Sequence, residues 1–204
     1  MEPIIHSKGE ETPEDHGEGK NRRRMKASSN RLVSELRDIL KTVVIAFVIM
    51  LLLNMFVFNL SMVKGQSMMP TLEGYERLFV DKLVYNLGHP KRGDVVVLKD
   101  PSIGTDKKSF LVKRVVGVPG DTVEVRKHTL FVNGKLQDEP YTDVKIEGDD
   151  VPAVKLGEKE YYVMGDNRHA GRSKDSRFFG SVQEEDIVGR ADFVFWPISK
   201  IRGL

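Results

Sequence analysis

The chain has 204 residues, of which 40% are apolar and 30% are charged, and its formal net charge is +2. This is the balance of an ordinary globular protein, and so small a net charge argues against binding of polyanions through overall charge. The absence of cysteine excludes disulfide bonds, thiolate catalysis and zinc sites with cysteine ligands.

Residues 1–38 are predicted to be a disordered tail, because they carry many charges and almost no apolar clusters. Most basic residues of this tail gather between Lys20 and Arg31, upstream of a long apolar run. Alone, such a cluster could bind nucleic acid, but beside an apolar run it is typical of the cytoplasmic side of a membrane span. We therefore expect a cytoplasmic tail and no nucleic-acid partner.

From Thr42 to Val63 the chain has 22 residues without a charged side chain. As a helix this run would be about 33 Å long, enough to cross a hydrocarbon core of about 30 Å. The alternative is a cleavable signal peptide, but its apolar core is shorter and ends in a small-residue site that is not found here. We predict a retained transmembrane helix over residues 39–63 and an extracytoplasmic domain over residues 64–204.

This domain is expected to be mainly β, with an antiparallel, barrel-like architecture. Short runs rich in β-branched and aromatic residues recur with turn signals between them. The expected strands are Leu78–Tyr85, Asp94–Leu98, Phe110–Val118, Thr122–Arg126, Leu130–Val132, Tyr161–Met164 and Ile187–Trp196. The pair Asn133-Gly134 favours a hairpin. Residues 136–158 are polar and are interpreted as an irregular surface insertion.

Ser67 is a candidate nucleophile. It lies between Gly65, which lets the backbone bend, and Pro70, which fixes it, and it is followed by the apolar Met68. A serine hydroxyl needs a neighbouring base. None of the five histidines has a pattern around it that would orient it, so a Ser-His-Asp triad is poorly supported, and G-x-S-x-G fails because position 69 is Met.

Lys113 is the better candidate for the base. It interrupts an apolar strand, and alternation places Leu111 and Val115 on the same face, which favours burial of its amine. Burial disfavours the charged form, and the pKa of a buried lysine can fall by about 2–3 units, toward working pH. The polar segments 165–168 and 173–177 are interpreted as groups that orient this lysine.

A second serine motif, Ser61-Met62-Val63-Lys64, fits the S-x-x-K pattern of penicillin-recognising enzymes. Those enzymes also need S-D-N and K-T-G segments, which this chain lacks. We therefore interpret this match as a coincidence.

Taken together, these residues resemble the type I signal peptidases, in the bacterial form with one N-terminal membrane anchor. The resemblance covers the chain from about residue 39 to residue 190. It depends on four segments in the family's order, which are Ser67–Leu72, Arg92–Val97, Lys113–Asp121 and Gly165–Arg168 with Asp175–Gly180.

The resemblance implies an enzyme that cuts signal peptides from secreted preproteins after small residues, commonly Ala-x-Ala, at a lipid surface. It implies a Ser-Lys dyad, with Ser67 as nucleophile and oxyanion donor and Lys113 as base, and no metal or other cofactor. The substrate would contact Val63, Met68, Leu111 and Val112. Four further residues would brace the site: Arg114, Asp166, Asp175 and Arg177.

Two departures from the family pattern affect the site. Some members have a serine as a second oxyanion donor where this chain has Gly65. The last segment is two residues longer than usual, so either Ser173 or Gly171 takes the position that hydrogen-bonds the lysine. We prefer Ser173, because it retains the hydroxyl.

Two other functions are compatible with parts of this pattern. A self-cleaving Ser-Lys repressor protease would have a related catalytic domain, but it would carry a DNA-binding domain in place of the apolar run. A membrane-anchored binding module would have the same organisation without catalysis.

Overall fold

The structure is a computed structural model that describes residues 35–53, 57–103 and 109–204. The chain divides into two compact units, residues 1–50 and residues 51–204. Most of the predicted tail lies outside the described residues, and its last four positions, 35–38, are helical.

Residues 35–53 form a helix whose large apolar side chains are exposed, from 40% at Leu53 to 65% at Leu36. In the described ranges, no helix meets both the length and the apolarity needed to span a bilayer. The predicted helix over 39–63 is wrong at its C-terminal end, because Phe58–Met62 is strand β1. This strand pairs antiparallel with β2, from Phe58 opposite Asp81 to Met62 opposite Arg77. Tertiary pairing thus overrides an apolar run that carries no periodicity of its own.

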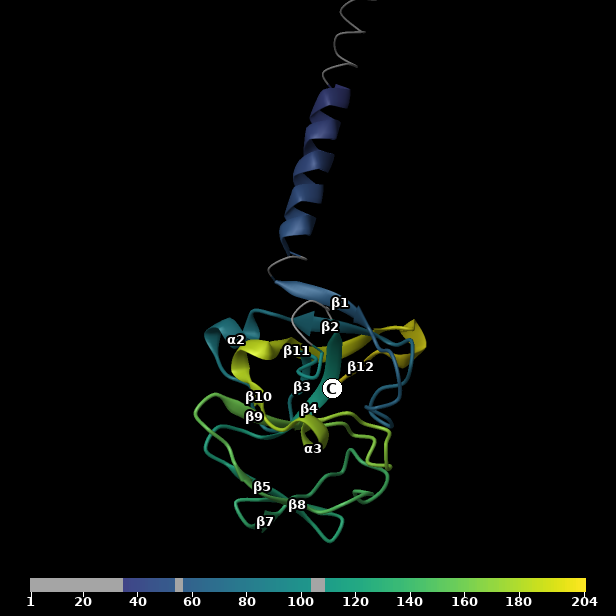
Figure 1. The fold of residues 1–204 in the computed structure, drawn as a ribbon. Coiled ribbons are helices and arrows are strands. Elements are labelled where there is room, and N and C mark those ends of the chain that lie inside the picture. The colour runs from purple at the N-terminus through teal and green to yellow at the C-terminus, as the bar shows by residue number, and fades with distance from the viewer. Residues whose placement is uncertain (1–34, 54–56, 104–108) are drawn as a thin grey trace, which may run out of the picture. The chain divides into compact units, whose positions relative to one another are not determined.

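The second unit is built on two antiparallel sheets that lie at different heights in Figure 1. The larger, eight-stranded sheet has the order β1 (Phe58–Met62), β2 (Arg77–Asp81), β11 (Ile187–Trp196), β3 (Val95–Lys99), β4 (Phe110–Gly117), β9 (Glu160–Met164) and β10 (Val182–Gln183), with β12 (Arg202–Gly203) beside β11. It stays open at β1 and β10, so the antiparallel fold that we expected is present without full closure into a barrel.

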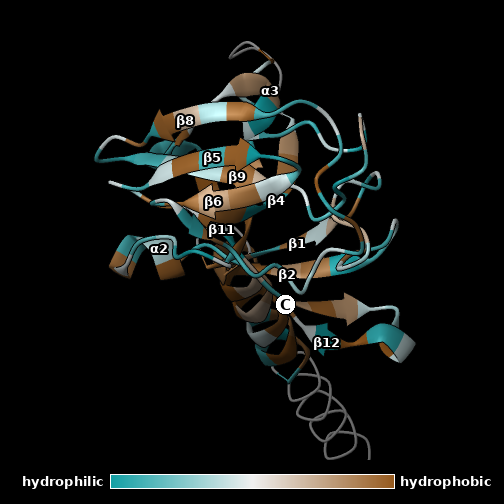
Figure 2. Cartoon of the chain, turned by 90° about the horizontal axis from the view of Figure 1, so that it is seen from below, coloured by the Kyte–Doolittle hydropathy of each residue, from teal (hydrophilic) through white to brown (hydrophobic). Residues whose placement is uncertain are grey.

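The smaller sheet has the order β7 (Lys135–Leu136), β6 (Thr129–Val132), β5 (Thr122–Arg126) and β8 (Val151–Lys155). Residues of β5 alternate between hydrophobic and hydrophilic (Figure 2), and its two valines are buried. Strand β8 corrects the expectation that residues 136–158 are an irregular surface insertion, since Ile146 and Leu156 are also buried in the core there. Pro152 in the sequence argues against a strand here, but β8 is an edge strand, and an edge strand tolerates proline.

Short helical turns complete the fold: α2 (Val84–Leu87), α3 (Ser176–Phe179), η1 (Glu184–Asp186) and η2 (Ile198–Lys200). The strand predicted over Leu78–Tyr85 is therefore too long. It ends at Asp81, whose carboxylate accepts the N–H groups of Leu83 and Val84 and so turns the chain into α2.

The core has three clusters of buried residues. One lies beneath the loop that joins β1 to β2 and contains Val63, Met68 and Leu72. Another contains Val96 and Val115, from the middle of β3 and β4. These two clusters hold the loop of Ser67 and the strand of Lys113 in place.

Candidate active site

Ser67 lies in the loop of residues 63–76, between β1 and β2. Gly65 opens this loop with a φ of 92°, a left-handed value that suits glycine. After Ser67 the chain is anchored by Met68 and Leu72, which are buried, and the N–H of Leu72 donates to the carbonyl of Met68 at 2.8 Å. The loop is therefore fixed on both sides of the half-buried serine.

Asn167 holds the same loop through two backbone carbonyls. Its side-chain Nδ2 donates to the carbonyl of Gln66 at 2.9 Å, and its backbone N–H donates to the carbonyl of Ser67 at 3.1 Å. The two segments approach so closely that a Cβ on Gly165 would collide with the carbonyl of Ser67 and with Ser173. Only glycine fits at position 165, and the segment after β9 thereby fixes the peptide of Ser67.

Lys113 lies in β4 with its amine against the serine. The Nζ atom is 2.8 Å from Ser67 Oγ and donates to the carbonyl of Val112 at 2.8 Å. The side chain is almost fully buried, and burial lowers the pKa of Lys113 to about 8, although nearby carboxylates raise it. A substantial fraction of the amine is therefore neutral at mildly alkaline pH, and a neutral amine can accept a proton.

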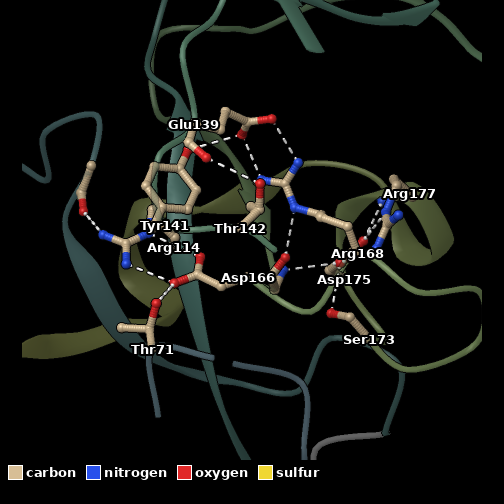
Figure 3. A network of polar contacts seen from close by, with 12 residues as sticks. Thr71, Arg114, Glu139, Tyr141, Thr142, Asp166, Arg168, Ser173, Asp175 and Arg177 are labelled. Carbon is tan, nitrogen blue, oxygen red and sulfur yellow. Dashed lines mark hydrogen bonds and ion pairs between the residues drawn. The ribbon is translucent and has the colours of Figure 1, made fainter. Parts of the chain in front are cut away.

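Two buried carboxylates near Lys113 are each paired with an arginine (Figure 3). Asp166 accepts two hydrogen bonds from Arg114, at 2.9 and 2.7 Å, and one from Thr71. Asp175 accepts two from Arg177, at 2.9 and 2.8 Å. Burial raises the pKa of Asp175, but the Arg177 contacts outweigh it and hold that pKa below its usual range. The negative charge of each carboxylate is thus balanced by its own arginine.

Arg168 links the site to the stretch that we had interpreted as an insertion (Figure 3). Its side chain is completely buried, its Nε donates to the carbonyl of Gly165 at 2.9 Å, and its two terminal nitrogens donate to Glu139 at 2.8 and 2.5 Å. Tyr141 stacks under Arg114, with the guanidinium carbon 4.1 Å from the ring centre. Residues around 139–141 therefore support the segment that follows β9 at the candidate site. Sequence reasoning missed this support.

A groove of about 510 Å³ runs past the serine and the lysine. One wall is the first half of β4, whose residues 110–113 pair, within the described ranges, with β3 alone. The other wall is the end of β1 with the start of the loop. The groove therefore has an exposed strand edge along one side. The residues predicted to bind substrate or flank the nucleophile all line it: Val63, Gly65, Met68, Leu111 and Val112.

Ser173 is near the predicted place but has a different partner. Its hydroxyl donates to Asp175 at 2.7 Å. Among the described residues, the hydrogen bonds of the Lys113 amine go to Ser67 and Val112. Gly171, the alternative, has a φ of 70° and no heavy atom within 4 Å of its Cβ position.

The described histidines have partners away from Ser67. His169 contacts Glu147 at 3.1 Å, His89 contacts Glu184, and His128 contacts the carbonyl of Ile146. Within the described ranges, no three acidic or histidine side chains gather as a metal site would require. The arrangement around Ser67 thus favours lysine over histidine as its base.

Comparison with known proteins gives one consistent result. The family model described as "Signal peptidase, peptidase S26" matches residues 36–196. The chain is 42% identical over 183 residues to Signal peptidase I P of Bacillus subtilis subsp. natto, which covers 84% of this chain and 95% of the relative. It is 39% identical over 185 residues to Signal peptidase IB of Staphylococcus aureus, covering 82% and 93%. A crystal structure of a signal peptidase I from Enterococcus faecalis is 31% identical, with a TM-score of 0.42, and covers 50% of this chain and 95% of that one.

Proposed function

The chain belongs to the S26 family of signal peptidases, serine endopeptidases that remove signal peptides from preproteins, and from this premise we propose that it cuts with Ser67 as nucleophile and Lys113 as general base. The observation that carries this proposal is the 2.8 Å contact between Lys113 Nζ and Ser67 Oγ, with the amine buried. A nucleophile and a base within hydrogen-bond reach are the geometry that acyl transfer requires.

In the first step the neutral amine of Lys113 takes the proton of the Ser67 hydroxyl, and Oγ attacks the carbonyl carbon of the scissile peptide. The resulting ammonium then gives this proton to the departing amine, which leaves an acyl ester on Ser67. In the second step Lys113 takes a proton from water, hydroxide adds to the ester, and the lysine returns the proton to Oγ. The carbonyl of Val112 keeps the amine directed toward Ser67 throughout.

The backbone N–H of Ser67 is the proposed donor to the oxyanion. In the described part of the chain no hydrogen bond uses this N–H, while the two carbonyls beside it are held by Asn167. A fixed donor stabilises developing charge without reorganisation when the reaction occurs. Because position 65 is glycine, a side-chain hydroxyl cannot assist from there.

The open edge of β4 is the proposed binding strand for the signal peptide. The carbonyl of Ser109 accepts a hydrogen bond from the backbone N–H of Asp100, which directly follows β3, so the backbone of Ser109 faces β3. Because backbone groups alternate between the two edges of a strand, those of Phe110 and Val112 face the opposite edge, toward the groove. An extended peptide can pair with such an edge by β-augmentation. The valines at positions 63 and 112 leave room for small side chains in the groove, which supports cleavage after Ala-x-Ala.

We also propose that the apolar helix attaches the enzyme to a lipid bilayer. The support is the exposure of its large apolar side chains and the basic cluster upstream, which favours a cytoplasmic N-terminus. External protease added to intact cells should then digest residues 64–204 and spare the tail. Digestion of the tail with protection of the rest would overturn this topology.

The dyad is tested by the pH dependence of preprotein cleavage by the purified full chain in detergent. Activity should rise with pH through one ionisation near 8, because only neutral Lys113 accepts the proton of Ser67. Ser67→Ala and Lys113→Arg should lose nearly all activity while remaining folded, since arginine keeps its proton in this pH range. His169→Ala and added chelator should change little. A folded Lys113→Arg variant with substantial activity would exclude the dyad.

A further inference from the structure

Residues 197–204 fold back onto the loop that carries Ser67. After β11 the chain forms η2 and then β12, which pairs antiparallel with β11. The N–H of Leu204 donates to the carbonyl of Asp192 at 3.0 Å, and the Leu204 side chain packs against the core cluster beneath the loop. This return of the chain brings the guanidinium of Arg202 against the second half of the loop.

Arg202 binds two positions of this loop at once. Its Nη2 atom donates to the carbonyl of Thr71 at 2.6 Å and to Glu76 Oε2 at 2.8 Å, and its Nη1 atom donates to Glu76 Oε1 at 2.9 Å. The side chain of Glu76 is 2% exposed and also accepts the N–H of Glu73 at 3.0 Å. One planar guanidinium therefore fixes the spacing between Thr71 and Glu76.

Glu76 in turn closes the base of the loop. Its backbone carbonyl accepts the N–H of Val63 at 2.8 Å, and the carbonyl of Val63 accepts the N–H of Tyr75 at 3.0 Å. Burial raises the pKa of Glu76, but the hydrogen bonds from Arg202 and from the N–H of Glu73 outweigh burial and hold that pKa below its usual range. Glu76 is thus a buried anion, and Arg202 is its cation.

Thr71 connects this anchor to the nucleophile. Ser67 begins a run of turns that ends at Thr71. The Thr71 hydroxyl donates to Asp166 on the side of β9, and the Thr71 carbonyl accepts from Arg202 on the side of β12. Without Arg202 only the first of these two anchors remains, and the turn that starts at Ser67 can shift with Thr71. A displacement of about 1 Å at a reacting atom can lower a rate by about 100-fold.

We propose that Arg202 is a positioning residue, which holds the loop so that Ser67 Oγ stays within reach of Lys113 Nζ. This inference rests on the proposed function, because it requires Ser67 to be the nucleophile. Arg202 acts on Thr71 and Glu76, whereas the proposed binding edge for substrate is in β4. Loss of Arg202 should therefore slow the chemical step and leave substrate binding nearly unchanged.

The first test measures kcat and KM of full-length Arg202→Ala in detergent, with a preprotein as substrate. The value of kcat should fall about tenfold and KM should change less than about twofold, because a contact that acts only on the reacting geometry lowers kcat and kcat/KM together. Arg190→Ala is the matched control, since Arg190 is 35% exposed, Arg202 is 36% exposed, and Arg190 is also paired with one carboxylate, that of Asp192. Its kcat should match that of the wild type. An unchanged kcat in folded Arg202→Ala would overturn the inference.

The second test restores the missing group at a temperature at which circular dichroism shows Arg202→Ala to be fully folded. The substitution leaves a space beside the Glu76 carboxylate that a free guanidinium ion can enter from solvent. Millimolar guanidinium, far below denaturing concentrations, should raise kcat of Arg202→Ala about threefold and leave Arg190→Ala unchanged. Methylammonium carries the charge without the planar fork and should raise kcat much less. Equal rescue by both cations, or no rescue by guanidinium, would overturn the inference.

A double variant carries the test if Arg202→Ala does not fold, since that variant contains a buried anion without a cation. Glu76→Gln/Arg202→Ala removes the anion and keeps an amide oxygen for the N–H of Glu73. Because the carbonyl of Thr71 still lacks its donor, kcat should remain low while stability recovers. A folded double variant with the kcat of the wild type would overturn the inference.

Failure of the proposed function has a different signature. If Ser67 and Lys113 are not the catalytic pair, Ser67→Ala or folded Lys113→Arg stays active, whatever Arg202→Ala does. If only the role of Arg202 is wrong, those two variants are inactive and Arg202→Ala has the kcat of the wild type.

Discussion

Residues 110–113 and residues 114–117 belong to one strand, β4, but among the described residues only the second half has a partner strand on both edges. The first half pairs with β3 and leaves its other edge to the groove. The second half pairs with β9, from Arg114 opposite Met164 onward, and is buried. One strand thus supplies both the open edge that we propose for substrate binding and a closed scaffold for the site.

The boundary falls between two adjacent basic residues with opposite requirements. In the proposed mechanism Lys113 must lose its proton, and its amine contacts a hydroxyl and a carbonyl. Arg114 must keep its charge, and it holds Asp166 through two hydrogen bonds. Changes in the first half should therefore lower activity, and changes in the second should lower stability.

The largest effect is expected in the closed half. Arg114→Met leaves the carboxylate of Asp166 buried without its cation and should lower the free energy of unfolding by about 3–5 kcal/mol. Arg126→Met is the matched control, because Arg126 also stacks on an aromatic ring but its ion pair is exposed. The control substitution should lower the free energy of unfolding by less than about 1 kcal/mol. Urea denaturation of both variants measures the difference, and equal losses would contradict the division.

Substrate size should matter in the open half. Replacing Ala-x-Ala before the cut by Leu-x-Leu should lower kcat/KM by about 100-fold, because the two leucines must fit against Val63 and Val112 in the groove. Cleavage of paired preproteins that differ only at these positions measures the ratio. Similar rates on both would show that the groove does not select small side chains.

Lys113→Met should stabilise the protein while abolishing activity. Burial lowers the pKa of Lys113 from 10.5 to about 8, so the unfolded chain binds this proton more tightly than the folded one. The resulting loss in the free energy of unfolding is complete below pH 8 and disappears as the pH rises to 10.5. Allowing for the lost hydrogen bonds, the variant should gain about 2 kcal/mol at pH 7. Denaturation at pH 7 and pH 10 checks the sign, and a gain that is the same at both values would refute this explanation.

The smallest effect concerns one backbone donor on the open edge. Phe110→Pro removes an N–H that is turned toward the groove and should lower kcat/KM about fivefold, mainly through KM, as expected for one hydrogen bond of about 1 kcal/mol. Phe110→Ala keeps the N–H and measures separately the effect of losing the phenyl side chain. If both variants lose activity equally, the edge does not pair with substrate.

Sequence patterns predicted the parts of this molecule in which chemistry is encoded locally. The bend at Gly65, the apolar neighbours of Lys113 and the order of the four family segments were readable, although Ser67 and Lys113 are 46 positions apart. The contacts that were missed join segments without a shared local pattern. Glu139 and Arg168 are 29 positions apart, and Asp100 and Lys174 are 74 apart. Strand β1 was missed because its pairing with β2, rather than its composition, makes it a strand.

The hydrogen bonds from Asn167 to the loop affect which substitutions this sequence can accept. Asn167 donates to the carbonyl oxygens of Gln66 and Ser67, and the side chain of Gln66 is exposed. Any amino acid that adopts the same backbone presents the same carbonyl, so position 66 should accept most replacements in a randomised library. Position 167 should accept very few, because it needs an amide that reaches one neighbour while its own N–H reaches the other. Two residues joined by one hydrogen bond would thus differ widely in their tolerance of mutation.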